Sequence, residues 1–235
     1  MKALIQPPFF EIGVKNYLYG DAVLELAKAA DSCAEECDVD VLFIAPYVDI
    51  RRIAENTRRL IIFAPYMDVL RPGRGIAHIL PESLKAAGAH GVVVNHSERP
   101  MSLSAIRETI DRANELDLLT FACADTIQET RAVAQFHPDI LNPEPSELIG
   151  TTGGGDLDFM YRSVEAVKSV STQILVEQAA GITSGDQVYK YISAGAEGVG
   201  VASGIAAAAD PIATMTEMIR AVKAARDDLA QTNHQ

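Results

Sequence analysis

The sequence predicts an α/β protein, a single (β/α)8 barrel spanning residues 1–235. Short apolar runs alternate with amphipathic stretches about eight times along the chain, which is typical of parallel strands joined by helices. No linker-like change in composition divides the chain. Side chains able to move protons follow several of the apolar runs, at the strand ends where active sites form in such folds. A doubly wound open sheet is the alternative.

Four strands are predicted in the first half of the chain, because each is an apolar run too short for a helix. They are 9–14, 41–45, 60–64 and 91–94. Helical spacing of apolar residues predicts helices over 21–37, 49–56 and 102–113, the last capped by Ser102 or Ser104. Pro81 suits the first turn of a helix over 81–87. Between them, the Pro72-Gly73 pair indicates an ordered loop, the arm 65–78.

The second half repeats the pattern. Its predicted strands are 119–124, 140–142, 174–176 and 198–201. Thr126 followed by Glu129 predicts a capping box for a helix to residue 135. Further helices are predicted over 157–170 and 185–194, a short one beginning near Ile205, and a last one that Asp210 caps and Pro211 begins.

Composition excludes several classes of partner. A net charge of −12 argues against general nucleic-acid binding. No apolar run approaches the roughly 18 residues of a membrane helix, and the first residues lack a signal pattern, so we expect a cytoplasmic protein with no membrane partner. The three cysteines are odd in number. Cys33 and Cys37 share an apolar helix face, where buried reduced thiols are expected rather than zinc ligands.

A cluster of reactive side chains forms if the eight strands close into a barrel. Lys15, His96 and Glu144 each follow a predicted strand, so a cation, an imidazole and a carboxylate would meet on one face. Two turns of small residues, 180–181 and 202–204, follow the seventh and eighth strands. Their backbone N–H groups could approach a phosphate. The sequence therefore predicts a site for a phosphorylated substrate.

These stretches resemble the triosephosphate isomerase family in its short archaeal-type form. The resemblance spans nearly the whole chain, and its motifs occur in the family's order. The motifs are Asn95-His96-Ser97-Glu98-Arg99, Glu144-Pro145-Ser146-Glu147-Leu148-Ile149-Gly150-Thr151, Ala180-Gly181-Ile182-Thr183, Val201-Ala202-Ser203-Gly204 and Ile79-Leu80-Pro81-Glu82.

The resemblance implies a TIM barrel that interconverts dihydroxyacetone phosphate and glyceraldehyde 3-phosphate through an enediolate, in glycolysis and gluconeogenesis. Carried over, Glu144 is the base, His96 the neutral electrophile, and Lys15 stabilises negative charge, with Glu98 as a supporting partner of Lys15. The implied phosphate-binding residues are Gly150, Thr151, Ala180, Gly181, Ala202, Ser203 and Gly204. A lid over 151–155, no metal or cofactor, a sugar-phosphate partner and a homo-oligomer, either dimer or tetramer, are implied as well.

Four departures from the family pattern leave the substrate open. Gly13 stands where the family has Asn, Ile76-Ala77 where its arm has Thr-Gly, and Pro65-Tyr66 where it has a more polar pair. The lid sequence Thr152-Gly153-Gly154-Gly155 is looser than the family's. The alternatives are therefore an isomerase of a related four-carbon ketose phosphate and a non-catalytic sugar-phosphate binding barrel. Another phosphate-binding barrel enzyme, an epimerase or an aldolase that uses Lys15, is a third possibility.

Overall fold

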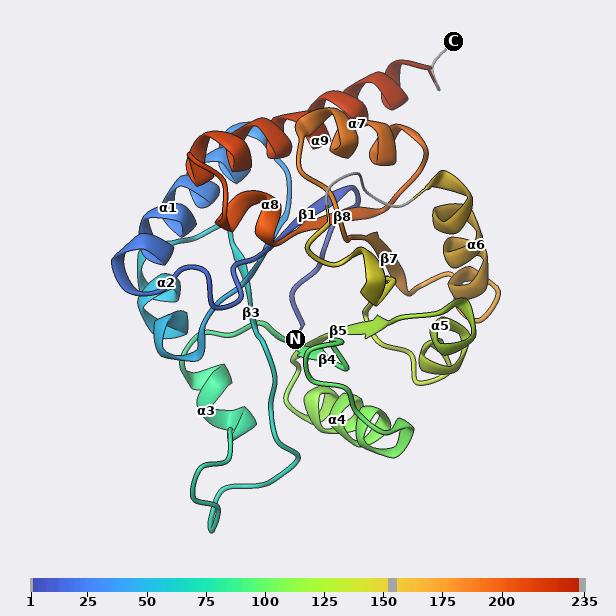
Figure 1. Ribbon diagram of the computed structural model, residues 1–235. Coiled ribbons are helices and arrows are strands. Elements are labelled where there is room, and N and C mark those ends of the chain that lie inside the picture. The colour runs from blue at the N-terminus through green and yellow to red at the C-terminus, as the bar shows by residue number, and fades with distance from the viewer. Residues whose placement is uncertain (1, 152–155, 233–235) are drawn as a thin grey trace.

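The computed structural model, which describes residues 2–151 and 156–232, shows a closed barrel of parallel strands. Strand β1 pairs with both β2 and β8, so the ring closes and the open sheet is excluded. The predicted (β/α)8 barrel is confirmed, and Figure 1 looks along its axis. The strands are β1 (Phe9–Gly13), β2 (Val41–Ile44), β3 (Ile61–Ala64), β4 (Gly91–Val94), β5 (Leu119–Ala124), β6 (Ile140–Pro143), β7 (Leu175–Gln178) and β8 (Gly198–Val201).

Helices surround the barrel (Figure 1). They are α1 (Gly20–Cys37), α2 (Ile50–Asn56), α3 (Pro81–Ala86), α4 (Leu103–Glu115), α5 (Ile127–Ala134), α6 (Leu157–Lys168), α7 (Gly185–Ser193), α8 (Ser203–Ala206) and α9 (Pro211–Thr232). Two 3-10 turns, η1 (Tyr47–Asp49) and η2 (Ser146–Leu148), follow β2 and β6. Within the described ranges, no helix has the length and hydropathy that crossing a bilayer requires.

The predicted helix caps are confirmed. Thr126 and Glu129 form the capping box of α5, with each side chain accepting from the other residue's backbone N–H. Ser102 accepts from Ala105 N–H at 3.2 Å at the start of α4. Asp210 accepts from Ala213 N–H at 3.0 Å at the start of α9. These caps satisfy N–H groups that the first helical turn leaves without an intrahelical partner.

The predicted boundaries agree with the structure to within two residues, and two of the differences bear on the site. Strand β7 continues through Glu177 and Gln178, two residues past its predicted end. Glu177 is buried inside the barrel, and Gln178 is buried on the outer side, where its amide donates to Ser163 Oγ of α6 at 3.3 Å. Helix α8 begins at Ser203 rather than near Ile205, since the Ala202 carbonyl already accepts hydrogen bonds from Ile205 and Ala206 N–H.

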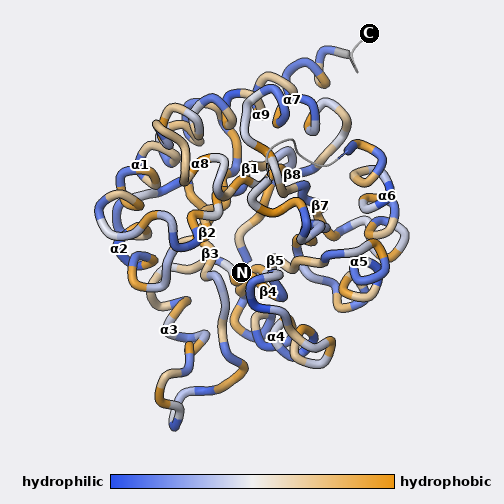
Figure 2. Tube along the Cα trace, viewed as in Figure 1, coloured by the Kyte–Doolittle hydropathy of each residue, from blue (hydrophilic) through white to orange (hydrophobic). Residues whose placement is uncertain are grey.

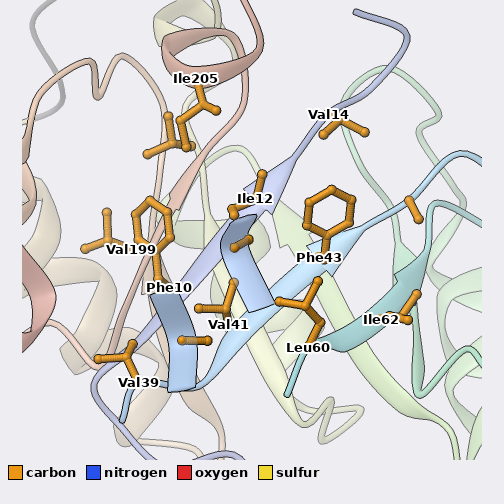
Figure 3. Close-up of a cluster of buried hydrophobic side chains, with 14 of the residues drawn as sticks. Phe10, Ile12, Val14, Val39, Val41, Phe43, Leu60, Ile62, Val199 and Ile205 are labelled. Atoms are coloured by element: carbon orange, nitrogen blue, oxygen red, sulfur yellow. The ribbon is translucent and has the colours of Figure 1, made fainter. Parts of the chain in front are cut away.

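Alternate residues of each strand pack into two separate cores. Outward-facing side chains pack against the helices in the first core; Figure 3 shows part of it, with Phe10, Ile12, Val14, Val41 and Phe43. Inward-facing side chains fill the barrel in the second. Members of this inner core are Ile5, Phe9, Leu42, Ile61, Phe63, Val93, Leu119, Phe121, Cys123 and Ile140. Figure 2 shows hydrophobic residues along the central strands and a mixture around the outer helices.

The arm between β3 and α3 extends away from the barrel (Figure 1). Asp68 holds its base, because its carboxylate accepts from Ile79 N–H at 2.7 Å and its own N–H donates to the Ile79 carbonyl at 3.0 Å. Ile76 is 95% exposed on the arm. The surface of the arm therefore carries a large exposed apolar side chain, that of Ile76.

Gly198→Ala should destabilise the barrel, because a Cβ at this position would lie 2.2 Å from the Phe9 ring. Overpacking of this kind costs about 1–3 kcal/mol, which urea unfolding would measure. In the Phe9→Leu/Gly198→Ala double variant, the loss should be smaller than the sum of the two single losses, since the clash is relieved. If Gly198→Ala unfolded at the same urea midpoint as wild type, the result would contradict this packing.

Candidate active site

A cavity of about 720 Å3 opens at the carboxyl end of the barrel. Lys15, His96, Glu98 and Glu144 line it together. Six of the predicted phosphate-binding residues also line it: Gly150, Ala180, Gly181, Ala202, Ser203 and Gly204. Thr151 is not among the lining residues; its hydroxyl donates to the Leu148 carbonyl at 2.7 Å. Residues 152–155 of the predicted lid lie outside the described part of the chain.

The loop after β4 positions His96. Asn95 adopts the left-handed conformation at φ 60°, which Asn tolerates better than most residues. Its side chain fastens the loop, because its amide donates to the Cys123 carbonyl at 2.9 Å and its oxygen accepts from Met101 N–H at 2.8 Å. His96 is thereby held at the end of its strand.

The hydrogen bonds of His96 favour one neutral tautomer. Its Nδ1 accepts from Glu98 N–H at 3.1 Å, so the proton of the neutral ring belongs on Nε2. Burial lowers the pKa of His96, and the Lys15 ammonium lowers it further. A neutral imidazole with its Nε2–H directed into the cavity is the result.

Glu144 lies opposite this imidazole, with its Oε2 3.7 Å from His96 Nε2. Its side chain is 11% exposed. Burial raises the pKa of Glu144 to about 6, while Lys15 opposes the rise and Glu98 adds to it. The backbone beyond Glu144 is fixed by Asp125, which accepts from both the N–H and the hydroxyl of Ser146 at 2.7 and 2.8 Å. Glu144 is therefore a carboxylate at neutral pH, but a stronger base than an exposed one.

Lys15 lies between the carboxylates of the cavity. Its Nζ donates to Glu98 Oε1 at 2.8 Å, and this bond lowers the pKa of Glu98. Lys15 itself has φ 46°, in the left-handed region. A non-glycine residue there costs about 1 kcal/mol or more, so the surrounding contacts hold the lysine in place.

The two small-residue turns after β7 and β8 touch one another. A Cβ on Gly204 would lie 2.3 Å from the Ile182 carbonyl oxygen. Ala180 and Gly181 both have positive φ, at 70° and 68°. The absence of larger side chains lets a ligand approach the backbone N–H groups of both turns.

Sequence reasoning missed a group of polar residues deeper in the barrel. Glu11 on β1, Asn142 on β6 and Glu177 on β7 are 6%, 3% and 0% exposed. Strand alternation places them inside, since Glu11 is two residues from the inward Phe9, and Asn142 is two residues from the inward Ile140. The available signal was the polar Glu11 in the middle of an otherwise apolar strand; Glu177 directly follows an apolar run.

Burial raises the pKa of both Glu11 and Glu177, and the neighbouring Glu144 raises both further. The two carboxyl groups lie close together, because Glu11 Oε2 and Glu177 Oε1 are each 2.6 Å from the position of a Cβ on Gly200. Mutual repulsion therefore also favours the protonated forms.

Comparisons with known proteins identify the family of the chain. The family model described as "Triosephosphate isomerase" matches residues 12–222. The chain belongs to the triosephosphate isomerase family. Proteins named triosephosphate isomerase are similar to it: that of Methanobacterium bryantii is 34% identical over 93% of this chain and 99% of the relative. That of Methanocaldococcus jannaschii is 35% identical over 87% and 94%. That of Methanopyrus kandleri is 36% identical over 85% and 90%.

The structure gives a reason for the departure from the triosephosphate isomerase pattern at position 13. A Cβ on Gly13 would lie 2.9 Å from Glu11 Oε1. A side chain at position 13 therefore competes with the Glu11 carboxyl for space. At the mouth of the cavity, Tyr66 lies under Arg99, whose Cζ is 3.8 Å from the ring centroid. The departure at Pro65-Tyr66 thus places a cation–π pair there.

Glu177→Gln should alter how stability depends on pH. The folded protein holds a proton on Glu177 that the unfolded chain releases above about pH 4.3, so wild-type stability falls as pH rises. The melting temperature of the variant minus that of wild type should therefore be at least about 2 °C higher at pH 8 than at pH 5. A change of this size corresponds to roughly 1 kcal/mol in a domain of this size.

Calorimetry at the two pH values measures this change. Glu35→Gln is the matched control, since Glu35 is exposed on α1, and its difference from wild type should not vary with pH. If the difference in melting temperature between Glu177→Gln and wild type were also the same at both pH values, Glu177 would titrate like an exposed glutamate.

Proposed function

We propose that this protein interconverts dihydroxyacetone phosphate and glyceraldehyde 3-phosphate. One observation carries the proposal: a buried carboxylate and a neutral imidazole face one another, with 3.7 Å between Glu144 Oε2 and His96 Nε2, in a cavity that Lys15 also lines. Membership of the triosephosphate isomerase family supports the same reaction.

Glu144 acts as the base in the first step. It removes a proton from the carbon next to the substrate carbonyl, and the electron pair of that C–H bond moves to form the enediolate. A pKa of about 6 suits this role, because the group is ionised at neutral pH and still attracts a proton. Burial in the cavity keeps competing water away from the carboxylate.

His96 and Lys15 stabilise the charge that develops on oxygen. The Nε2–H of His96 donates to the carbonyl oxygen, and the Lys15 ammonium attracts both the enediolate and the phosphate. The protonated Glu144 then returns its proton to the neighbouring carbon, while the hydroxyl proton passes between the two oxygens by way of His96. Substrate and product contain the same atoms, so the reaction consumes no other reactant.

The phosphate binds where the two small-residue turns meet. Ala180-Gly181 and Ala202-Ser203-Gly204 line one side of the cavity, and Gly150 and Thr151 belong to the segment that continues into the predicted lid. This position keeps the phosphate dianion away from the buried carboxyl groups of Glu11 and Glu177. Family membership further supports a homo-oligomer, dimer or tetramer, that uses the arm, and a role in the cytoplasm in glycolysis or gluconeogenesis.

Glu144→Gln should lower kcat for dihydroxyacetone phosphate by at least about 10²-fold, because an amide of the same shape cannot accept the proton. A coupled assay of glyceraldehyde 3-phosphate formation measures the effect. Glu165→Gln, on the exposed face of α6, should match wild type. Unchanged turnover in Glu144→Gln would remove Glu144 from the mechanism, and a wild-type protein inactive on both triose phosphates would overturn the proposal itself.

A further inference from the structure

The cavity continues below the proposed catalytic groups to a polar floor, formed by Glu11 and Asn142 with Glu177 behind them. Glu11 and Asn142 line the cavity, as does Gly200, against which both glutamates lie. All three side chains come from inward-facing strand positions, on β1, β6 and β7. The floor lies near the catalytic groups, since Glu144 and Lys15 both influence the pKa of Glu11.

Several buried oxygen atoms of this floor have no hydrogen-bond partner among the described residues. In the described part of the chain, nothing donates to Glu11 Oε1, Asn142 Oδ1 or either carboxyl oxygen of Glu177. Buried polar groups are almost always paired, because an unpaired one costs about 1–3 kcal/mol. Three such residues in one layer, two of them on a cavity wall, indicate that the floor is built for a hydrogen-bonding ligand.

The residues around the floor preserve space for that ligand. Gly13 and Gly200 both lie against the Glu11 carboxyl, and a Cβ on either would approach it to 2.9 or 2.6 Å. Larger residues at these two positions would fill the floor and displace the carboxyl group. The apolar inner core reaches the cavity wall at Val93 and Phe121, and its Phe9 lies two residues before Glu11 on β1.

We propose that Glu11 and Asn142, with Glu177 supporting Glu11, form a hydroxyl-binding subsite for a sugar phosphate longer than triose phosphate, and that the enzyme therefore acts on a four-carbon ketose phosphate. This inference rests on the proposed function, because the turns after β7 and β8 fix the phosphate and the catalytic groups fix the reacting carbons. With that spacing, Glu144 moves the proton between C3 and C2 of erythrulose 4-phosphate, the carbonyl shifts between the same two carbons, and C1 with its hydroxyl extends toward the floor.

The chemistry of the floor matches a hydroxyl better than an ion. Burial and mutual repulsion favour the protonated forms of Glu11 and Glu177. Protonated carboxyl groups attract cations only weakly, and the nearby Lys15 ammonium repels cations. Carbonyl oxygens of the amide and of a protonated carboxyl accept from a hydroxyl, and the carboxyl proton can be donated in return. An anionic phosphate is disfavoured so close to carboxyl groups.

Calorimetric titration with two unreactive ligands tests the subsite. Glycerol 3-phosphate and erythritol 4-phosphate differ by one hydroxyl-bearing carbon, so their affinity ratio isolates the floor. Wild type should bind erythritol 4-phosphate at least about tenfold more tightly, the value of one or two buried hydrogen bonds. Equal affinities, or a preference for glycerol 3-phosphate, would overturn the proposal.

Variants connect the preference to the floor. Glu11→Leu and Asn142→Leu should each reduce the affinity ratio to near one, whereas Glu11→Gln should keep most of it, because an amide oxygen still accepts from a hydroxyl. The ratio cancels any effect of a substitution on phosphate binding, because both ligands carry the same phosphate. Glu35→Leu is the control on the exposed face of α1. If Glu11→Leu fails to fold, Asn142→Leu gives the same comparison from β6. A wild-type ratio in both leucine variants would contradict the subsite.

Kinetics separates failure of the subsite from failure of the proposed function. With erythrulose 4-phosphate and dihydroxyacetone phosphate as substrates, wild type should show the larger kcat/KM for the four-carbon compound. Turnover of dihydroxyacetone phosphate without any binding preference would leave the isomerase standing and overturn the subsite. A preference that depends on Glu11, with neither substrate isomerised, would support the subsite and overturn the isomerase.

Discussion

Closure of parallel strands into a barrel fixes which side chains share the interior, and the rest of this molecule depends on that constraint. Every second residue of each strand points inward, into a space with little water. Toward the amino ends of the strands, residues such as Phe9, Phe63 and Phe121 fill that space as an apolar core. Toward the carboxyl ends the same alternation places Glu11, Asn142 and Glu144 around one cavity.

Burial of several carboxyl groups beside a single ammonium group determines the electrostatics of the cavity. Lys15 stabilises the charged forms of Glu11, Glu98 and Glu144. It does so unequally, because Glu98 is largely exposed and hydrogen-bonded to it, whereas Glu11 is buried. The pKa values of Glu98 and Glu11 consequently move in opposite directions, and Glu144, raised to about 6, can exchange a proton near neutral pH.

The fold and the upper part of the site follow from the sequence because their signals are local. Apolar runs, helix caps and the motif around His96 are each contained in about ten residues, and strand ends of a barrel converge whatever its exact register. The floor was missed because it depends on register. Glu11 could be assigned to the interior only once β1 was paired with β8, and Glu177 was left outside the predicted strand 174–176.

Deuterium exchange tests the central claim, that this cavity moves a proton between solvent-exchangeable Glu144 and a carbon next to a carbonyl. The wild-type protein would be incubated with dihydroxyacetone phosphate in D2O, and the recovered sugar phosphates examined by proton NMR. The account predicts deuterium at the carbon from which Glu144 removes its proton, in the product and in returned substrate. Dihydroxyacetone phosphate that binds yet gains no deuterium would contradict it.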